Sequence, residues 1–454
     1  MKPAVLALLL AGCTSMAPEY KRPASPVPQQ FANASANSAP QLALGDFVRD
    51  PKLRSVIAQA LAQNRDLRAA ALSIEAARQQ YRIQRAAALP AIDAGLGVTR
   101  ARSLVGPDNA TVTTTVYSAQ VGLAAWEIDF FGRLKSLSNA REQQYLSTVE
   151  NALAARISLV GEISTAYVAL AADQSRLLIA KDTAELAKKT MDLTDQLVAG
   201  GTSNRGDFFQ ASTVYQQARA DVALLTAAIA QDRNALELLA GGPIAPDLLP
   251  TALPEQLDWF AEVPVGLSSA VLLERPDVRA AEHDLMAANA NIGEARARFF
   301  PSITLTASGG LASLTLAALF TGPAAVFTLA PALGLPLFRG GANKANLAYT
   351  RAQKELFVAQ YERSIQVAFR EVSDALAVRG TIEEQLAAQA ALVDASVKAV
   401  ELAQGRYKGG IDPFLTTLVS QRALYGAKNS LVSTQLAALV NRVTLYRVIG
   451  GGLR

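Results

Sequence analysis

The chain has 454 residues, half of them apolar, and a formal net charge of +4 at neutral pH. Its lysines and arginines are scattered along the sequence, which argues against a nucleic-acid partner. Beyond the first residues, no window comes near the roughly 20 uninterrupted apolar residues that a membrane-spanning helix needs. We therefore expect no transmembrane helix.

The first 13 residues have the order of a bacterial secretion signal. Lys2 precedes an apolar stretch from Ala4 to Ala11, and Cys13, the only cysteine of the chain, follows closely. A single cysteine can form neither an internal disulfide nor a multi-cysteine metal site. The tetrapeptide Leu10–Cys13 resembles the lipobox, in which cleavage before the cysteine frees its thiol to receive a lipid. We expect a signal peptide over residues 1–12 and a covalent lipid on Cys13; an ordinary signal peptide is the alternative.

The segment that follows is rich in Pro, Ser, Asn and Gln, so we expect residues 13–50 to form an extended, lipid-anchored tether. Beyond it the chain repeats itself. Three residues of one motif recur at one constant offset: Asp66, Arg68 and Pro90 match Asp277, Arg279 and Pro301. We predict two copies of one unit, residues 51–242 and 268–454, joined by a proline-rich connector over 243–267.

Each copy begins with a helix that ends at Pro90 or Pro301, since proline breaks helices. Alternating stretches then predict two strands per copy, at about 90–102 and 114–127, and at about 301–312 and 324–338. In the second of these, we expect Tyr117 to Ala125 to place every other residue on one apolar face, and in the last we expect Leu333 to face lipid. Period two over about ten residues is typical of outer-membrane strands. A soluble hairpin is the alternative for any one pair, but the pattern occurs four times.

The same order continues with very long helices. Gly132 to about Val198 and Gly341 to about Lys408 contain no proline, and each ends at a Gly-Gly pair before a second helix returns. Their apolar residues follow the spacing of a coiled coil. Four strands cannot close a barrel, and a membrane sheet cannot keep free edges. The chain must therefore oligomerise: two copies would give eight strands around a lumen packed with side chains, and three would give about twelve strands with room for a channel.

Several motifs in both repeats resemble those of the TolC/OprM outer-membrane factors, in their lipoprotein (NodT-like) branch. They are PEYKRP at 18–23, AAWEIDFFGR at 124–133, ERPDVRAAE at 274–282, LPLFRGGAN at 335–343 and GRYKGGIDPFLTTLVSQRALY at 405–425. The resemblance implies an α+β membrane protein, a homotrimer with a transmembrane β-barrel of about twelve strands that continues as a periplasmic α-helical barrel. It also implies an outer-membrane exit duct of a tripartite efflux pump, which contacts outer-membrane lipid, a periplasmic adaptor protein and an inner-membrane transporter.

The turns between the long helices are candidate contact sites. Gly200–Gly201 and Gly409–Gly410 each join two antiparallel helices and should lie at the periplasmic tip. Glycine commonly ends helices, so helix termination alone is one reading. The resemblance implies contact with the adaptor as a second.

The helix after the second turn matches the aperture-lining helix of the family. Leu415, Val419 and Arg422 recur at spacings of four and three, so they share one face. Relatives often place an aspartate where Val419 stands, and this chain does not. Asp207 and Asp412 near the turns could supply negative charge and bind Arg422; solvated or helix-capping aspartates are the alternative.

Enzyme functions are poorly supported. His283 stands alone, and Glu127 and Asp129 lie two residues apart on a strand-like stretch with no sign of a cleft. Phosphate-loop and dinucleotide glycine motifs are lacking. We expect no catalysis and no cofactor besides the lipid. A coiled-coil outer-membrane lipoprotein of structural or adhesive role, without a through-channel, is the alternative function.

Overall fold

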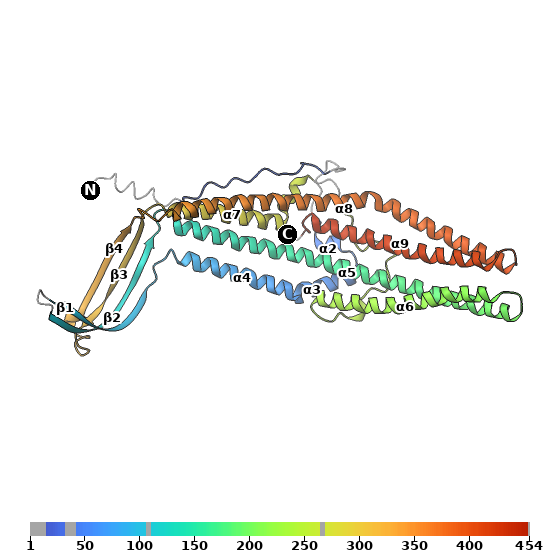
Figure 1. Ribbon diagram of the computed structural model, residues 1–454, viewed down its shortest axis with the longest axis horizontal. Helices are drawn as coiled ribbons and strands as arrows, with labels where there is room; N and C mark the ends of the chain where they lie inside the picture. The colour runs from blue at the N-terminus through green and yellow to red at the C-terminus, as the bar shows by residue number, and fades with distance from the viewer. Residues whose placement is uncertain (1–14, 32–41, 106–109, 264–267, 453–454) are drawn as a thin grey trace. The chain divides into compact units, whose positions relative to one another are not determined.

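The computed structural model describes residues 15–31, 42–105, 110–263 and 268–452 (Figure 1). The expected signal peptide and Cys13 lie outside the described residues. The chain divides into two compact units. The first contains the described residues up to Ala24, Ser73–Val149 and Ala280–Arg363; the second contains Ser25–Leu72, Glu150–Arg279 and the rest from Ser364.

The first unit contains one four-stranded antiparallel sheet in the order β1-β2-β3-β4. The strands are β1 (Asp93–Val105), β2 (Ala110–Ile128), β3 (Ser302–Ser313) and β4 (Ala325–Gly334). Each repeat contributes one neighbouring pair, and β1 and β4 form the two open edges. The last strand ends at Gly334, four residues before the expected end, because Pro336 beyond it has no N–H to donate to a neighbouring strand.

A β-bulge in β2 changes which residues share a face. Leu123 pairs with Ala307 and Trp126 with Leu305, so β2 carries one extra residue between these pairs. Ala125 lies in the bulge with a φ of 48°, and its N–H donates to Thr306 Oγ1. The expectation that period two continues to Ala125 is therefore wrong, because the extra residue moves the apolar face from odd to even positions.

One face of this sheet is apolar, and no helix or strand of the described residues covers it. Leu96 on β1 is 85% exposed, and Leu333 on β4 is 68% exposed. Ile128, Ile303 and Leu333 are matched through the register, as are Glu127, Thr304 and Ala332 on the opposite face. The sheet therefore presents an apolar face and a face of small and polar residues, as a membrane barrel strand requires.

Helices complete the first unit. They are the greater part of α4 (Arg65–Ala86), most of α7 (Pro276–Ala297), and the first parts of the 67-residue helices α5 (Arg133–Ala199) and α8 (Ala342–Lys408). The one-turn helix η3 (Gly322–Ala324) precedes β4. Three alanines let α5 and α7 pack closely: Ala140, Ala287 and Ala290.

An 18-residue window of α5 is apolar enough to cross a membrane, but half of it is buried inside the protein, as in a core helix.

Residues 15–22, which we call the strap, belong to the expected tether and lie along α7. Glu282, itself buried, accepts hydrogen bonds from Tyr20 and, in bidentate fashion, from Arg22. Further along α7, Asn289 donates to Pro18 O at 2.7 Å. A Cβ at Gly293 would lie 2.6 Å from Ala17 N, so the strap needs a glycine there.

The second unit is helical. It holds α2 (Leu44–Phe47), α3 (Pro51–Gln63), α6 (Arg205–Ala240), α9 (Phe414–Val448), the short helices η1 (Pro246–Leu248) and η2 (Ser269–Glu274), and the remainder of α5 and α8. Phe47 stacks on Tyr446 at 4.0 Å and on Phe260 at 5.2 Å. Arg442 donates to Leu257 O, 2.6 Å away, which ties the connector to α9.

The buried Arg275, from the repeated motif before α7, joins three helices of the second unit. Its guanidinium donates to both oxygens of Asp277, to Glu371 Oε2 on α8 at 2.9 Å and to Val448 O on α9 at 2.9 Å. A buried arginine is tolerated only when its donors are satisfied, and this one satisfies them across elements far apart in sequence. The motif therefore has a structural role.

Candidate functional site

The Gly-Gly turns end the long helices by backbone geometry. Gly201 and Gly410 have φ values of 70° and 69°, a region that other residues rarely adopt. Thr202 N–H donates to Leu197 O and Ile411 N–H to Arg406 O, which satisfies carbonyls of the last helical turn. The first glycine of each pair, Gly200 or Gly409, has no positive φ, so the backbone there does not demand glycine.

The ends of four helices pack together next to these turns. Ala187 of α5, Ala211 and Val214 of α6, and Phe414 and Leu418 of α9 form one buried cluster. Tyr407 of α8 packs against it, with its ring edge-on to Phe414 at 5.3 Å. The helical hairpins of the two repeats are therefore held to each other at their tips.

The opposite face of α9 is open. Leu415 is 53% exposed and Val419 59% exposed, while Phe414 and Leu418 are buried. Arg422 is exposed on the same face as Leu415 and Val419. Two large apolar side chains without cover beside a helix tip are costly in water, which suits a surface that meets other copies in an assembly.

Arg422 binds neither of the two expected aspartates within the chain. Its Nη2 donates to Thr213 Oγ1 of α6 at 2.8 Å. Three residues further on, Tyr425 OH donates to Asp221 Oδ2 of α6 at 2.7 Å. Burial, followed by the bond to Asp221, raises the pKa of Tyr425 to about 12, so the phenol keeps its proton at neutral pH. These two hydrogen bonds, here called the α6–α9 ties, join the first repeat to the second.

Asp412 and Asp207 are occupied locally. Asp412 accepts a bidentate pair of bonds from Arg406 across the second turn, at 2.7 and 2.9 Å, and this arginine holds the pKa of Asp412 below its usual value. Asp207 accepts from Ser203 Oγ and Asn204 Nδ2 in the first turn of α6. Both aspartates therefore bond to groups of their own helix tip, and the side chain that caps α6 is Asn204, which accepts the N–H of Asp207. Sequence reasoning missed Thr213, Tyr425 and Asp221, since no local pattern marks bonds between residues more than 200 positions apart.

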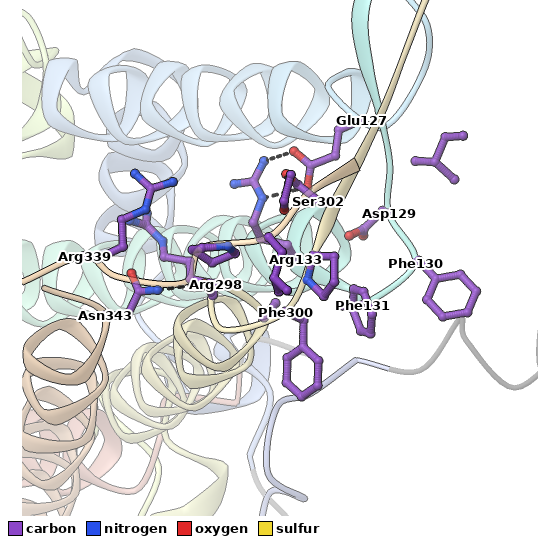
Figure 2. A pocket seen from close by; sticks show the side chains of 16 residues that line it. Glu127, Asp129, Phe130, Phe131, Arg133, Arg298, Phe300, Ser302, Arg339 and Asn343 are labelled. Carbon is purple, nitrogen blue, oxygen red and sulfur yellow. Dashed lines mark hydrogen bonds and ion pairs between the residues drawn. The ribbon is translucent and has the colours of Figure 1, made fainter. Parts of the chain in front are cut away.

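A second site lies in the first unit, where β2 runs into α5 and β4 into α8. It is a cavity of about 430 Å³, here called the junction pocket (Figure 2). Arg133 Nε donates to Glu127 Oε1 at 2.8 Å, and Asp129 Oδ2 accepts the N–H of Lys135 in the first turn of α5. These contacts give both carboxylates a role in joining strand to helix, in place of a glycosidase pair.

The rest of the junction pocket is cationic at one end and aromatic at the other. Figure 2 shows Arg298, Arg339 and Asn343 together on one side, and Phe130 and Phe131 on the other. Asn343 Nδ2 donates to Arg298 O at 2.8 Å, which links the start of α8 to the end of α7.

His283 contacts a neighbouring helix. Its Nδ1 lies 2.7 Å from Gln143 Oε1, a contact between α7 and α5. Among the described residues there is no group of three or more His, Cys, Asp or Glu side chains that could hold a metal ion.

Known proteins are similar to this chain along both repeats. The family model described as outer membrane efflux protein matches residues 56–242 and 267–451, one match for each repeat. The toluene efflux pump outer membrane protein TtgI of Pseudomonas putida is 42% identical over 461 residues, which cover 99% of this chain and 97% of that protein. The outer membrane protein OprJ of Pseudomonas aeruginosa is 40% identical over 455 residues, covering 99% and 95%.

Solved structures agree with the fold. The open state of the Neisseria gonorrhoeae MtrE outer membrane channel superposes with a TM-score of 0.85 at 36% identity, covering 97% of this chain and 99% of that one. Structures of CusC, described in terms of transmembrane channel formation, give a TM-score of 0.89 at 36% identity, covering 97% and 100%. The predicted trimeric β-barrel with an α-helical extension is confirmed, as is the outer-membrane location. The chain belongs to the outer membrane efflux protein family.

Proposed function

We propose that this chain is the duct through which a tripartite efflux pump releases small, largely apolar toxic molecules from the cell. Relatives more than 40% identical along nearly the whole chain are named for solvent, toluene and antibiotic efflux, and this observation carries the proposal. The trimeric channel works with a periplasmic adaptor and an inner-membrane transporter, and the transporter supplies the energy. The duct itself catalyses nothing and needs no cofactor besides a lipid.

The tip of the helical hairpins is the proposed gate. Three copies of α9 would bring Leu415 and Val419 toward the threefold axis, where apolar side chains block ions by dewetting. The α6–α9 ties would hold α9 in this position. Adaptor binding at the loops of Gly200–Gly201 and Gly409–Gly410 would then release it. Asp207 and Asp412 would keep these loops in shape for that contact.

Cys13 is the proposed lipid attachment site. The strap starts at Ser15, two residues after Cys13. Its contacts with α7 hold the residues that follow Cys13 against the first unit. Metabolic labelling with palmitate should mark the wild type and leave Cys13→Ser unlabelled. Equal labelling of both would contradict the proposal.

Complementation tests the function directly. In a bacterium that lacks its own efflux duct but keeps a matching adaptor and transporter, expression of this chain should restore tolerance to toluene. Purified trimers should conduct ions in planar bilayers. Trimers that never conduct, with or without adaptor, would instead favour a structural lipoprotein without a through-channel.

A further inference from the structure

The junction pocket contains more positive charge than its strand-to-helix role requires. Three guanidinium groups from three separate segments line it: Arg133, Arg298 and Arg339. Arg133 is neutralised by Glu127, and Arg298 Nε pairs with Glu294, which is buried on α7. Within the described part of the chain, Arg339 has no carboxylate at ion-pair distance.

The two carboxylates that line the pocket, Glu127 and Asp129, lie on the side away from Arg339 (Figure 2), and Asp129 Oδ1 is buried without a hydrogen-bond partner among the described residues. Glu127 accepts two bonds from Arg133. Asp129 uses Oδ2 to accept a backbone N–H of α5. The first turn of α8 carries no acidic residue to offset the positive end of the helix dipole. The side of the pocket near Arg339 is therefore short of an anion.

Apolar surface adjoins this cationic end. Leu335 lines the pocket, and Leu337 and Phe338, directly before Arg339, are each 89% exposed. Phe131 stacks on Phe300 at 4.9 Å along the aromatic end. Aromatic and arginine side chains in this combination are typical of a membrane–water interface, where the apolar part of a side chain meets lipid and the charge meets headgroups.

The position of the pocket selects one leaflet. The apolar sheet face ends here, and the helices that begin here are periplasmic in this family of channels. Glycerophospholipids form the periplasmic leaflet. A phosphodiester accepts paired hydrogen bonds from a guanidinium, and basic pockets at membrane surfaces bind anionic lipids by the same chemistry.

We propose that the junction pocket binds the headgroup of an anionic glycerophospholipid of the periplasmic leaflet, with Arg298 and Arg339 at the phosphate and the acyl chains along Leu337 and Phe338. The bound lipid neutralises Arg339 and covers apolar surface that the chain itself leaves open. The proposal rests on the membrane position of the sheet and is independent of what the duct exports.

Native mass spectrometry of the purified trimer tests this assignment. With phosphatidylglycerol and phosphatidylcholine of equal chain length, the wild type should retain phosphatidylglycerol preferentially. Arg339→Gln should weaken its retention about tenfold, which corresponds to about 1.4 kcal/mol. Arg339→Lys should keep most of it. Arg100→Gln, which removes an exposed arginine of β1 outside the pocket, should change nothing.

Several results would overturn the proposal. Equal retention of both lipids, or equal retention by Arg339→Gln and Arg100→Gln, would remove the pocket from lipid binding. Displacement of the lipid by millimolar inorganic phosphate would make it a site for soluble anions. If Arg339→Gln fails to form trimers, Arg298→Gln serves as the second variant, with the same expected loss. A cryo-electron microscopy map in phosphatidylglycerol nanodiscs with the neighbouring subunit's chain inside the pocket would also overturn it.

Discussion

Removing the α6–α9 ties should open the proposed gate without unfolding the channel. We consider the double substitution Arg422→Ala with Tyr425→Phe. The bond from Tyr425 to Asp221 is 2.7 Å long, is partly buried and has a charged acceptor, so it contributes about 1.5–3 kcal/mol. The bond from Arg422 to Thr213 is exposed, and water competes for both groups. We therefore assign it about 0.5–1 kcal/mol, the lower part of what a typical hydrogen bond contributes to stability.

Together the ties would stabilise the proposed closed arrangement by about 2–4 kcal/mol per chain, equivalent to a factor of roughly 30 to 1,000 in the ratio of open to closed states. Loss of the tyrosine hydroxyl does not leave Asp221 without a partner, because Gln217 Nε2 still donates to its Oδ1 at 2.9 Å. The variant should therefore fold, and its trimers should withstand purification. Single-channel conductance in planar bilayers should rise, and cells should become sensitive to vancomycin, which is too large for an intact outer membrane.

Arg219→Ala is the matched control. Arg219 lies on α6, where its guanidinium donates to Gln216 and lies over the ring of Tyr215, both on the same helix. In this control, conductance should stay at the wild-type value. Adding Leu415→Ser to the double variant should raise conductance above that of the double variant alone. Unchanged conductance of the double variant, with the trimer intact, would place the gate elsewhere. An equal rise in Arg219→Ala would show that any change at the tip loosens it.

Three further predictions concern other parts of the chain. Glu282→Gln should release the strap, because an amide cannot replace the buried carboxylate that accepts hydrogen bonds from Tyr20 and Arg22 of the strap. Limited proteolysis should then cut the chain before α3. Leu333→Arg should lower trimer yield in the membrane fraction only slightly, because Leu333 lies one residue from the junction pocket at the membrane–water interface, where a basic residue costs about 0–1 kcal/mol in each chain. The bond from Arg406 lowers the pKa of Asp412, so its stabilisation is present above the ordinary carboxyl pKa and is lost as pH falls through the lowered value. Protease sensitivity of the wild-type tip should therefore rise in acid, and Asp412→Asn should show no such pH dependence.

Local signals in the sequence were sufficient for the two long helices, whereas α4 and α7 each end four residues before the expected Pro90 and Pro301. The expected long helices, from Gly132 to about Val198 and from Gly341 to about Lys408, differ from α5 and α8 by one residue at the ends or not at all. The absence of proline lets a helix continue, and a Gly-Gly pair ends it within one turn. These helix bounds can therefore be predicted without knowing the tertiary contacts. The pairing of β1 with β2 and of β3 with β4 also followed, because a short connection joins each pair, whereas the contact between β2 and β3 was not predicted.

Features that depend on an inserted residue or on distant partners could not be predicted. Counting every second residue along β2 fails at the bulge near Ala125, since nothing in the local sequence marks the extra residue. Glu127 and Asp129 looked like a free carboxylate pair until the start of α5 supplied Arg133 and the N–H of Lys135. The junction pocket itself draws its walls from three separate segments, whose meeting depends on the packed fold.

The bond between Arg422 of α9 and Thr213 of α6 indicates different roles for the two repeats. Gly200 and Gly409 are matching positions of the repeats, and the same separation of 209 residues joins Thr213 to Arg422. The tie therefore connects equivalent positions of α6 and α9, which must face each other. Leu415 and Val419 correspond in the same way to Gly206 and Gln210.

This correspondence limits which helix can close the duct. At the two levels where α9 presents leucine and valine, α6 presents a residue with no side chain and a polar one. Leu415 and Val419 of α9 would therefore build the apolar constriction at these two levels, and Phe209 of α6, which is 57% exposed, could add an apolar side chain between them. The first repeat would contribute the acceptors Thr213 and Asp221 that hold α9 in place. Sequence divergence between the copies would thus give the second repeat the moving part of the gate and the first repeat its support.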